Sequence, residues 1–229
     1  MFYDATYLLV AIGAIICMIA SARVKAVYSK YSKVRSATGL TGAQAASKML
    51  AAAGIYDVTI RHVSGNLTDN YNSSNKTLNL SDSVYDSTSV AAIGVACHEC
   101  GHAIQDQVKY VPLTFRHMFV PVANFGSKLA WPVFLVGLFI NNEAGLFLLQ
   151  AGIFLFILAV LFHIITLPVE FNASGRALTQ MEALGFLGND ELKMAKKVLK
   201  AAALTYVASA FSALLQLLRL VLLANRRRD

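Results

Sequence analysis

Two histidines and a glutamate near the middle of the chain have the spacing of a metal-binding helix. Residues 98–102 read His-Glu-Cys-Gly-His. Residues four apart lie on the same face of an α-helix, so the imidazoles of His98 and His102 can reach one ion. Glu99 lies about 100° around the helix from His98 and can accept a proton from a water on the open side of that ion. The pattern predicts a zinc hydrolase in which His98 and His102 bind the metal and Glu99 is the catalytic base.

The helix that carries this motif is predicted to be buried. Residues 90–105 are mostly apolar and rich in alanine and glycine, as in helices that pack closely against neighbours on most sides. Buried histidines and carboxylates need partners, because an unpaired polar group costs free energy inside a protein, and a metal ion supplies one. Gln105 and Asp106 fall near the histidine face and could orient the imidazoles. A polar helix end in contact with solvent is the alternative for these two residues.

Two histidines leave a zinc site one protein ligand short. His62, His117, His163 and several carboxylates could complete it. Glu170 is the best candidate, because it follows Pro168 just beyond an apolar segment and therefore falls near the start of an expected helix. The alternative for Glu170 is a carboxylate that only stabilises a helix N-terminus.

The composition is that of a membrane protein. Of the 229 residues, 56% are hydrophobic and 14% are charged, and the mean hydropathy is +0.55, which is too apolar for a soluble domain of this length. Four apolar segments account for the excess, at residues 7–22, 119–140, 144–167 and 201–223. The first is interpreted as an uncleaved anchor, because the basic residues of a signal peptide do not precede it. The last carries a narrow polar stripe, so it either spans the bilayer or lies in its interface.

Basic residues indicate an orientation. Five of them follow the first apolar segment closely and none precedes it, which puts the N-terminus outside the cell. The predicted organisation is a transmembrane anchor (1–22), a cytoplasmic catalytic region with the motif (23–118), a transmembrane helical hairpin (119–167), a cytoplasmic helical region with the third ligand (168–200), and a C-terminal apolar helix with a basic tail (201–229). If the last helix spans, its three terminal arginines lie outside, against the same rule. The net charge of +7 is explained by these membrane flanks, and no nucleic-acid partner is expected.

A small soluble region precedes the motif. Residues 58–61 and 77–80 alternate in hydrophobicity like strands, and the Asn-rich stretch 65–76 has the composition of a turn or loop. The expected fold is therefore mainly α, an integral membrane helical protein with a zincin-like motif helix and a small β-hairpin. A strand beside a catalytic helix could hold an extended peptide through its backbone. A purely structural flap is the alternative.

Several blocks of the sequence resemble a known family. Residues 96–105 around the motif, 67–71 before it and 168–178 after it are similar to the neutral zinc metallopeptidases of bacterial membranes, the YugP type, and the similarity covers nearly the whole chain. The resemblance implies a gluzincin arrangement with one zinc ion per chain. The implied ligands are His98, His102 and Glu170, and the implied base is Glu99.

Two positions depart from the family pattern. Asn172 stands where an aspartate is usual, and Asn70 where a histidine is common. If either residue contacts a ligand or the substrate, the rate or the specificity changes with it. The residues expected to support the ligands or to contact the substrate are Gln105, Asp106, Tyr71, Asn172, Ser174 and Arg176. For the oxyanion of the reaction, Arg176, Tyr71, His117 and Arg219 are all candidates.

The expected function is that of a membrane-embedded zinc metalloendopeptidase, which hydrolyses peptide bonds with zinc-activated water and Glu99 as general base. Its partners are expected to be the lipid bilayer and peptide or membrane-protein substrates, and an oligomer or partner membrane proteins remain open. The expected location is a bacterial cell membrane, with the active site at the cytoplasmic face. The alternative is a non-catalytic zinc-binding membrane scaffold or a subunit of a membrane complex. The open fourth position and the glutamate between the histidines favour catalysis, because a structural zinc site normally fills all four positions.

Overall fold

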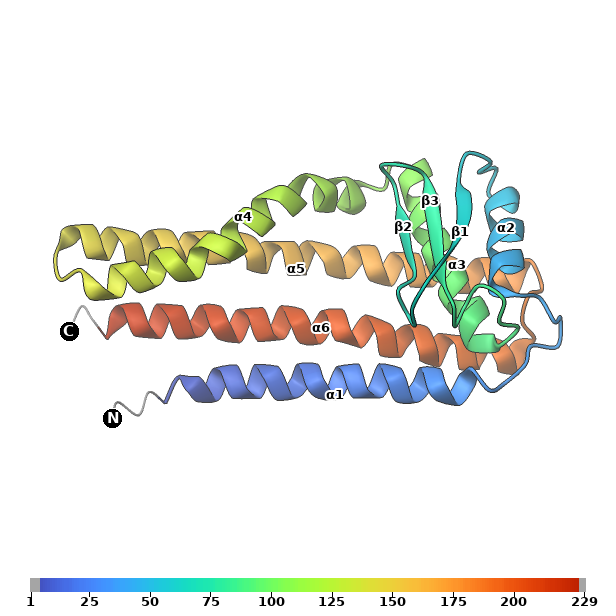
Figure 1. Cartoon of the computed structure of the whole chain (residues 1–229), viewed down its shortest axis with the longest axis horizontal. Helices are drawn as coiled ribbons and strands as arrows, with labels where there is room; N and C mark the ends of the chain where they lie inside the picture. Colours follow the sequence, from blue (N-terminus) through green and yellow to red (C-terminus); the bar gives the residue numbers. More distant parts are fainter. Residues whose placement is uncertain (1–4, 227–229) are drawn as a thin grey trace. The chain divides into compact units, whose positions relative to one another are not determined.

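The computed structural model describes residues 5–226, and within this range the chain is mainly α-helical (Figure 1). The helices are α1 (Tyr7–Tyr31), α2 (Gly42–Ala52), α3 (Val90–Gln107), α4 (Val111–Phe139), α5 (Glu143–Ala183) and α6 (Asn189–Asn225). The strands are β1 (Thr59–Val63), β2 (Asn70–Asn72) and β3 (Thr77–Ser81). The mainly α fold class is confirmed. Two of the three terminal arginines, at 227 and 228, lie outside the described residues.

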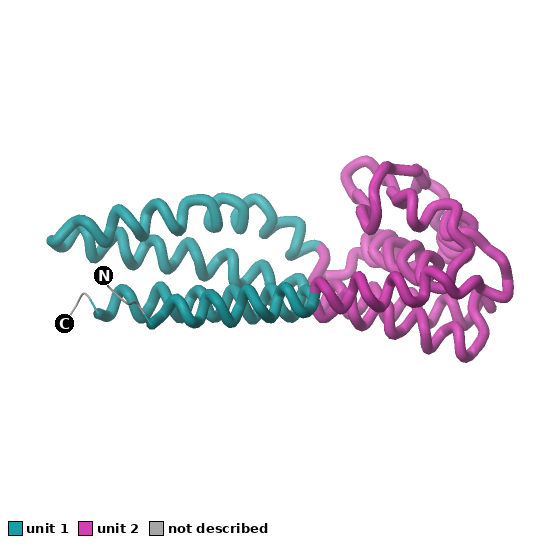
Figure 2. The backbone as a smooth tube through the Cα atoms, turned by 60° about the horizontal axis from the view of Figure 1, so that its bottom comes forward, with its two compact units in different colours: residues 1–20, 114–167, 205–229 teal, residues 21–113, 168–204 magenta. Residues whose placement is uncertain are grey.

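The chain divides into two compact units (Figure 2). Unit 1 comprises residues 1–20, 114–167 and 205–229, and unit 2 comprises residues 21–113 and 168–204. Unit 2 contains the whole sheet together with α2 and α3. The motif helix and the segment with Glu170 therefore belong to the same unit.

The sheet of unit 2 differs from the predicted hairpin. Its order is β1-β3-β2, with β1 parallel to β3 and β2 antiparallel to β3. A parallel pair needs a long connection, and residues 64–76 supply it. This connection also contains β2, in the stretch that the sequence indicates as a loop. β2 is only three residues long and reads Asn-Tyr-Asn, which is too short and too polar to show a strand pattern.

The motif helix α3 lies in the core of unit 2. Ser89 is its N-cap, and the Ser89 side chain accepts a hydrogen bond from the backbone of Ala92. The side chains of Leu78 and Leu80, in β3, are fully buried in the same core as the apolar face of α3. The motif is therefore built on a helix that is packed on most sides, in agreement with the burial expected from its small residues.

Helix α5 is continuous for 41 residues, and Pro168 lies in its interior. The predicted helix start at Pro168 is therefore wrong. A proline inside a helix removes one backbone hydrogen bond and crowds the carbonyl four residues earlier, which is why it usually marks an end. Apolar helices tolerate it where side chains and neighbouring helices satisfy the freed groups. The continuity makes Glu170 part of a rigid element.

Unit 1 consists of long apolar helical segments that pack closely. A Cβ atom at Gly152 would lie 2.7 Å from Cβ of Phe134, and one at Gly137 would lie 2.8 Å from the backbone nitrogen of Leu149. Small residues at such contacts let helix backbones approach each other, as in membrane helix pairs. The α4–α5 hairpin predicted from the sequence is therefore held together by glycine contacts.

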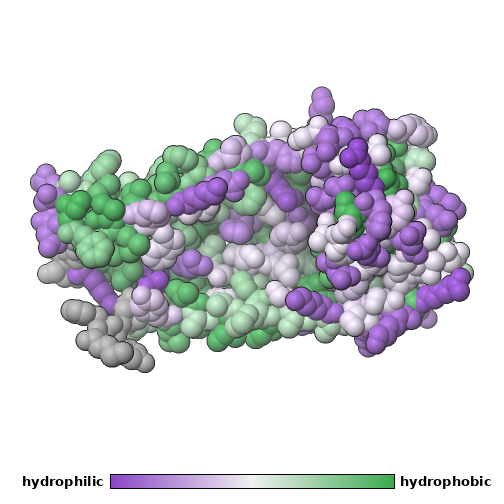
Figure 3. Space-filling view, viewed as in Figure 1, coloured by the Kyte–Doolittle hydropathy of each residue, from purple (hydrophilic) through white to green (hydrophobic). Residues whose placement is uncertain are grey.

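Four helices of the described chain, α1, α4, α5 and α6, are long and apolar enough to cross a membrane. In the space-filling view, hydrophobic side chains predominate over the helical segments of unit 1, and hydrophilic ones are more frequent over the sheet and α2 (Figure 3). Length and composition thus allow α6 to span, which is one of its two predicted placements.

Candidate metal centre

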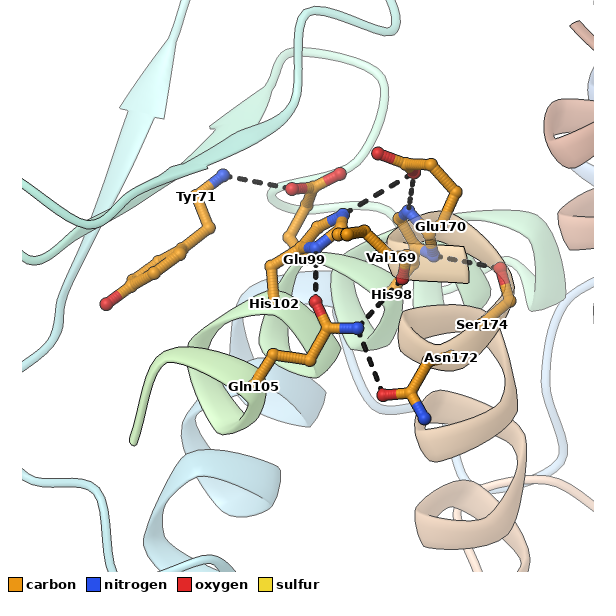
Figure 4. A network of polar contacts seen from close by, with 9 residues as sticks. All are labelled: Tyr71, His98, Glu99, His102, Gln105, Val169, Glu170, Asn172 and Ser174. Atoms are coloured by element: carbon orange, nitrogen blue, oxygen red, sulfur yellow. Dashed lines mark hydrogen bonds and ion pairs between the residues drawn. The ribbon is translucent and has the colours of Figure 1, made fainter. Parts of the chain in front are cut away.

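Three potential ligand atoms meet in unit 2. Nε2 of His98 lies 3.3 Å from Oε2 of Glu170, and Nε2 of His102 lies 3.6 Å from the same oxygen. The ligand atoms of the three residues lie within 4.8 Å of one another. Two turns of α3 supply the histidines and α5 supplies the glutamate (Figure 4). Among the described residues, this is the one cluster of three or more histidine, cysteine or acidic side chains with metal-binding geometry.

The packing of two helix backbones brings these residues together. A Cβ atom at Gly101 would lie only 2.5 Å from the carbonyl oxygen of Ala173. Glycine at position 101 therefore lets α3 touch α5 one residue before His102 and three residues after Glu170. Any larger side chain at this position would push the two ligand-bearing helices apart.

His102 is held by a side-chain amide. Its Nδ1 lies 3.0 Å from Oε1 of Gln105, a residue with no exposed surface. The amide nitrogen of Gln105 donates to the carbonyl oxygen of Val169 at 2.8 Å, which fixes the orientation of the amide. Because the amide oxygen can only accept, Nδ1 of His102 donates to it, and Nε2, which faces Glu170, is the nitrogen left for a metal. The site therefore turns the correct nitrogen of His102 towards a metal.

The same chain of hydrogen bonds continues along α5. The Oδ1 atom of Asn172 accepts from Nε2 of Gln105 at 3.0 Å and from Nε of Arg176 at 2.7 Å. The Arg176 guanidinium also lies over the ring of Tyr110, 6.0 Å from its centre. Arg176 thus orients Asn172, and Asn172 in turn supports the amide that holds His102.

His98 has a separate partner. Its Nδ1 lies 3.1 Å from the hydroxyl of Ser174, which is 9% exposed. Ser174 lies one turn of α5 beyond Glu170, so one helix face supplies both the carboxylate and the hydroxyl. A hydroxyl that accepts from Nδ1 leaves Nε2 of His98 available to a metal.

Glu99 lies beside the imidazoles, on the side of β2. Its Oε2 accepts a hydrogen bond of 2.9 Å from the backbone nitrogen of Tyr71. In Figure 4 the Glu99 carboxylate stands between this nitrogen and the cluster of His98, His102 and Glu170. Glu99 is buried, with 9% of its surface exposed, and the backbone bond from β2 holds one of its carboxylate oxygens in place.

Tyr71 and Lys76 attach the β2 region to the end of α3. The Tyr71 hydroxyl donates to Oδ2 of Asp106 at 2.8 Å, and Nζ of Lys76 lies 2.6 Å from the same oxygen. Asp106 thus binds the β2 region to α3 through these two contacts, whereas Gln105 orients the imidazole of His102. Burial and the hydrogen bond to Asp106 raise the pKa of Tyr71 well above its usual value, so its hydroxyl stays protonated.

The charges of the cluster match its geometry. Burial opposes ionisation of Glu170, but its close contacts with His102 and His98 outweigh burial and hold the pKa of this carboxyl well below its usual range. Burial also opposes the charged form of His102, yet the Glu170 and Glu99 carboxylates raise its pKa overall. Glu170 is therefore ionised at neutral pH, in the form that binds a cation.

The remaining candidates lie elsewhere. His62 pairs with Asp82, with 2.7 Å between Nε2 and Oδ1, and His117 and His163 belong to unit 1. Arg219 also belongs to unit 1, where it is 8% exposed and lies 4.1 Å from the centre of the Tyr7 ring. Asn70 accepts a hydrogen bond from the Asn79 side chain across the β2–β3 pair, so it stabilises the sheet.

Sequence reasoning missed two contributors to the site. One is the carbonyl oxygen of Val169, whose hydrogen bond orients Gln105; a backbone group leaves no signature in a residue pattern. The other is Lys76, whose bond to Asp106 connects the Asn-rich connection to α3. Lys76 directly precedes β3 in the chain, and nothing in the sequence around it indicates a contact with α3.

The donor set suits zinc. Two imidazoles that are each hydrogen-bonded at Nδ1, and a buried carboxylate facing both Nε2 atoms, match the two nitrogens and one oxygen found in catalytic zinc sites with an open fourth position. His98, His102 and Glu170 would hold the ion.

Comparison with known proteins agrees with this chemistry. Residues 6–225 match the family described as "Putative neutral zinc metallopeptidase". The chain is also similar to the "Putative membrane protease YugP" of Bacillus subtilis (strain 168), with 46% identity over 207 residues that cover 90% of this chain and 91% of the relative. No solved structure matches the chain.

Proposed function

This chain belongs to the neutral zinc metallopeptidase family, and we propose that it is a membrane-embedded zinc endopeptidase with Glu99 as its general base. One observation carries the proposal. The Nε2 atoms of His98 and His102 face the same buried oxygen of Glu170 while their other ring nitrogens are occupied by hydrogen-bond partners. Such an arrangement pre-organises three ligands around one small volume.

The residues of the chain divide the chemistry between them. A zinc ion held by the three ligands would lower the pKa of water towards neutrality and polarise a peptide carbonyl. The backbone of Tyr71 holds one oxygen of Glu99, which leaves the other oxygen to accept a proton from the attacking water. Glu99 then returns this proton to the amine that leaves, so that one carboxylate serves as base and as acid.

The position of β2 favours an extended peptide as substrate. β2 is the last strand in the order β1-β3-β2, and the backbone N–H of Tyr71 points away from β3 towards Glu99. A peptide that adds along this edge would pass beside the catalytic carboxylate. The proposal therefore includes β2 as the strand that aligns the substrate.

The proposal places the enzyme in a bacterial cell membrane, with unit 2 on the cytoplasmic side. The basic residues that follow the apolar part of α1, and those at 193–200 in α6, support this orientation. Peptides close to the bilayer and membrane proteins would then be the natural substrates.

The competing function is a structural zinc site in a membrane scaffold. A structural site normally has four protein ligands, and the cluster in the described part of the chain offers three. Three ligands leave one coordination position open for water, and Glu99 lies beside it. A catalytic site needs both features, and a structural site needs neither.

The test uses the full-length protein in detergent micelles, with casein and a quenched fluorescent peptide as substrates. We expect one zinc ion per chain by elemental analysis for the wild type and for Glu99→Gln. Cleavage by Glu99→Gln should fall at least ~100-fold, because a general base contributes about 10²–10⁴-fold to the rate. Glu182→Gln, an exposed change on α5, is the matched control and should cleave at the wild-type rate.

Three outcomes decide the matter. Zinc bound with unchanged cleavage in Glu99→Gln contradicts the assignment of the base. Zinc bound with no cleavage by the wild type, under conditions in which it stays folded, favours the scaffold. Absence of zinc from the wild type, or its retention in full by His102→Ala, refutes the metal site.

A further inference from the structure

A hollow lined by residues of α1 and α6 lies in unit 2, apart from the metal centre. It is a cavity of about 430 Å³, and its cationic lining consists of Arg23, Lys30, Lys197 and Lys200. The remaining lining residues, such as Val27, Tyr31 and Leu204, are apolar or aromatic, and none of them is acidic. This basic pocket contains none of the residues of the metal centre.

The cations converge on the pocket because of their helical spacing. Arg23 and Lys30 are seven residues apart on α1, and Lys197 and Lys200 are three apart on α6, so each pair lies on one helix face. Other lysines of the same helices, Lys25 and Lys196, do not line the pocket. The rule that basic residues flank membrane spans accounts for all these lysines equally and does not explain why four cations surround one hollow.

No acidic side chain balances this charge within residues 5–226. None of the four cations forms an ion pair within the described residues. Lys30 contacts the ring of its neighbour Tyr31, with 5.5 Å from its nitrogen to the ring centre. Like charges that converge on one hollow repel one another, and the exposure of the four side chains to solvent lowers this repulsion without removing it. An anion in the pocket would offset this repulsion.

Tyr31 adds an unused donor. It is 7% exposed and lines the pocket, and among the hydrogen bonds of the described residues none involves its hydroxyl. Most of the Tyr31 side chain is buried while its hydroxyl oxygen stays accessible, so it can donate to a ligand in the pocket. An oxyanion in the pocket offers several acceptor oxygens for this donor.

The pocket lies next to the apolar segments of α1 and α6, after the end of the first and at the start of the second. Arg23 follows directly on residues 7–22, and Leu204 comes directly before the part of α6 that belongs to unit 1. Lys30 lies about 10 Å along the helix from Arg23, at 1.5 Å per residue. The polar layer of a bilayer leaflet is roughly 5–8 Å thick, so the pocket extends over the depth of the lipid headgroups.

We propose that the basic pocket binds the phosphate of an anionic phospholipid, with phosphatidylglycerol as the simplest example. The four cations and the Tyr31 hydroxyl would surround the phosphate, while the side chain of Leu204, within the apolar segment of α6, would contact the apolar part of the lipid. A zwitterionic lipid carries its own cation next to the phosphate and would meet like charge in the pocket. A free phosphate ion shares the charge but lacks the apolar contact.

The experiment measures lipid binding by the full-length protein in a neutral detergent at constant ionic strength. Phosphatidylglycerol, phosphatidylcholine and inorganic phosphate are added separately, and native mass spectrometry and the thermal midpoint report binding. We expect phosphatidylglycerol to be retained and to raise the midpoint, with little effect of the other two. Equal effects of phosphatidylglycerol and phosphatidylcholine, or of inorganic phosphate alone, would overturn the proposal.

Two pairs of substitutions with the same change of charge separate the pocket from general surface charge. Lys197→Gln with Lys200→Gln should weaken phosphatidylglycerol binding about 25-fold, since each basic residue near an anionic lipid contributes roughly fivefold. Lys25→Gln with Lys196→Gln should change it less than about threefold, because these lysines lie outside the pocket. Equal losses in both pairs would show an unspecific charge effect and refute the pocket.

Arg23→Gln with Lys30→Gln provides a second pocket variant on the other helix, and it should weaken binding to a similar extent. The thermal midpoint of each variant without lipid shows that it is folded. Unaltered binding in both folded pocket variants would also refute the proposal.

Discussion

At the scale of single residues, the hydrogen bonds behind the ligands decide whether the site can hold a metal. Gln105 is the central group, because its amide connects His102 to α5 through the carbonyl of Val169. The orientation of this amide determines which nitrogen of His102 carries the proton. A change at position 105 therefore acts on the metal without touching it.

We expect Gln105→Met to weaken zinc binding about 10–100-fold, the usual effect of removing a group that supports a ligating histidine. Methionine has a similar length but cannot accept the proton of Nδ1, so His102 loses its fixed tautomer. Competition with a chelating dye measures the affinity. Gln107→Met, at an exposed position on the same helix, is the control, and an equal loss there would contradict the role of Gln105.

The departure at Asn172 has a physical explanation in the same chain of bonds. Oδ1 of Asn172 accepts from both Gln105 and Arg176, and an aspartate oxygen could accept both bonds equally well. We expect Asn172→Asp to keep zinc affinity within about threefold of the wild type, whereas Asn172→Leu should lower it at least about tenfold. The dye competition assay compares the two variants. A leucine variant that binds zinc normally would show that the chain of bonds is unimportant.

The residues that could be identified from the sequence are those with a periodic signature. The spacing of His98, Glu99 and His102 specifies a shared helix face, and the structure has all three on α3. Glu170 could be proposed from its place after an apolar segment and from the family resemblance. The support for His102 could not be traced as far as Val169, because its carbonyl comes close only through the packing of α3 on α5.

At the scale of elements, the contact between α3 and α5 sets the distance between the ligands. The contact depends on Gly101, because a Cβ atom there would meet the Ala173 carbonyl at 2.5 Å. Backbone atoms cannot rotate away as a flexible side chain can. Helix α3 would have to shift, and the histidines would shift with it.

We expect Gly101→Ala to lower the free energy of unfolding by about 1–3 kcal/mol, as overpacking does, and to weaken zinc binding. Gly94→Ala is the matched control on the same helix, since its Cβ would lie at an ordinary 3.5 Å from the Ala195 side chain. That variant should be neutral or more stable by up to about 1 kcal/mol, because alanine favours a helix. Denaturant unfolding compares them, and equal stability of the two variants would contradict this account.

The elements that the sequence did not predict are those determined by distant contacts. The strand β2 forms because β3 and Glu99 offer partners to its backbone, and its own three residues carry no pattern. The parallel pairing of β1 with β3 follows from the path of residues 64–76, which local composition does not specify. The continuation of α5 through Pro168 likewise depends on the packing of the helix and not on proline itself.

At the scale of the whole molecule, the amino-acid composition correctly predicted the number of helices that could span a membrane. Four apolar segments were identified from hydropathy, and each lies in a helix that is long enough to span a membrane. The helices extend beyond the apolar segments into unit 2, however, and carry Glu170 and the basic pocket there. Hydropathy marks where a helix could meet lipid but not where the helix ends.

The orientation of the chain in the membrane gives a final prediction. The distribution of basic residues puts the α4–α5 turn outside the cell and the loop after α2 inside. We expect the end of α6 outside as well, because this helix is long and apolar enough to span. The variants Asn141→Cys, Asn225→Cys and Tyr56→Cys introduce exposed thiols at these three places. A membrane-impermeant maleimide should label the first two variants in intact cells, and Tyr56→Cys only after lysis.

The wild-type chain is the control for this labelling. Cys97 and Cys100 are buried and burial raises the pKa of both thiols, which keeps them unreactive. Cys17 is partly exposed but lies within the apolar segment of α1, so its labelling in the wild type gives the background. Labelling of Tyr56→Cys in intact cells would reverse the orientation. Labelling of Asn225→Cys only after lysis would show that α6 does not cross. In that case its polar stripe would lie in the membrane interface and the terminal arginines would remain in the cytoplasm, as the distribution of basic residues favours.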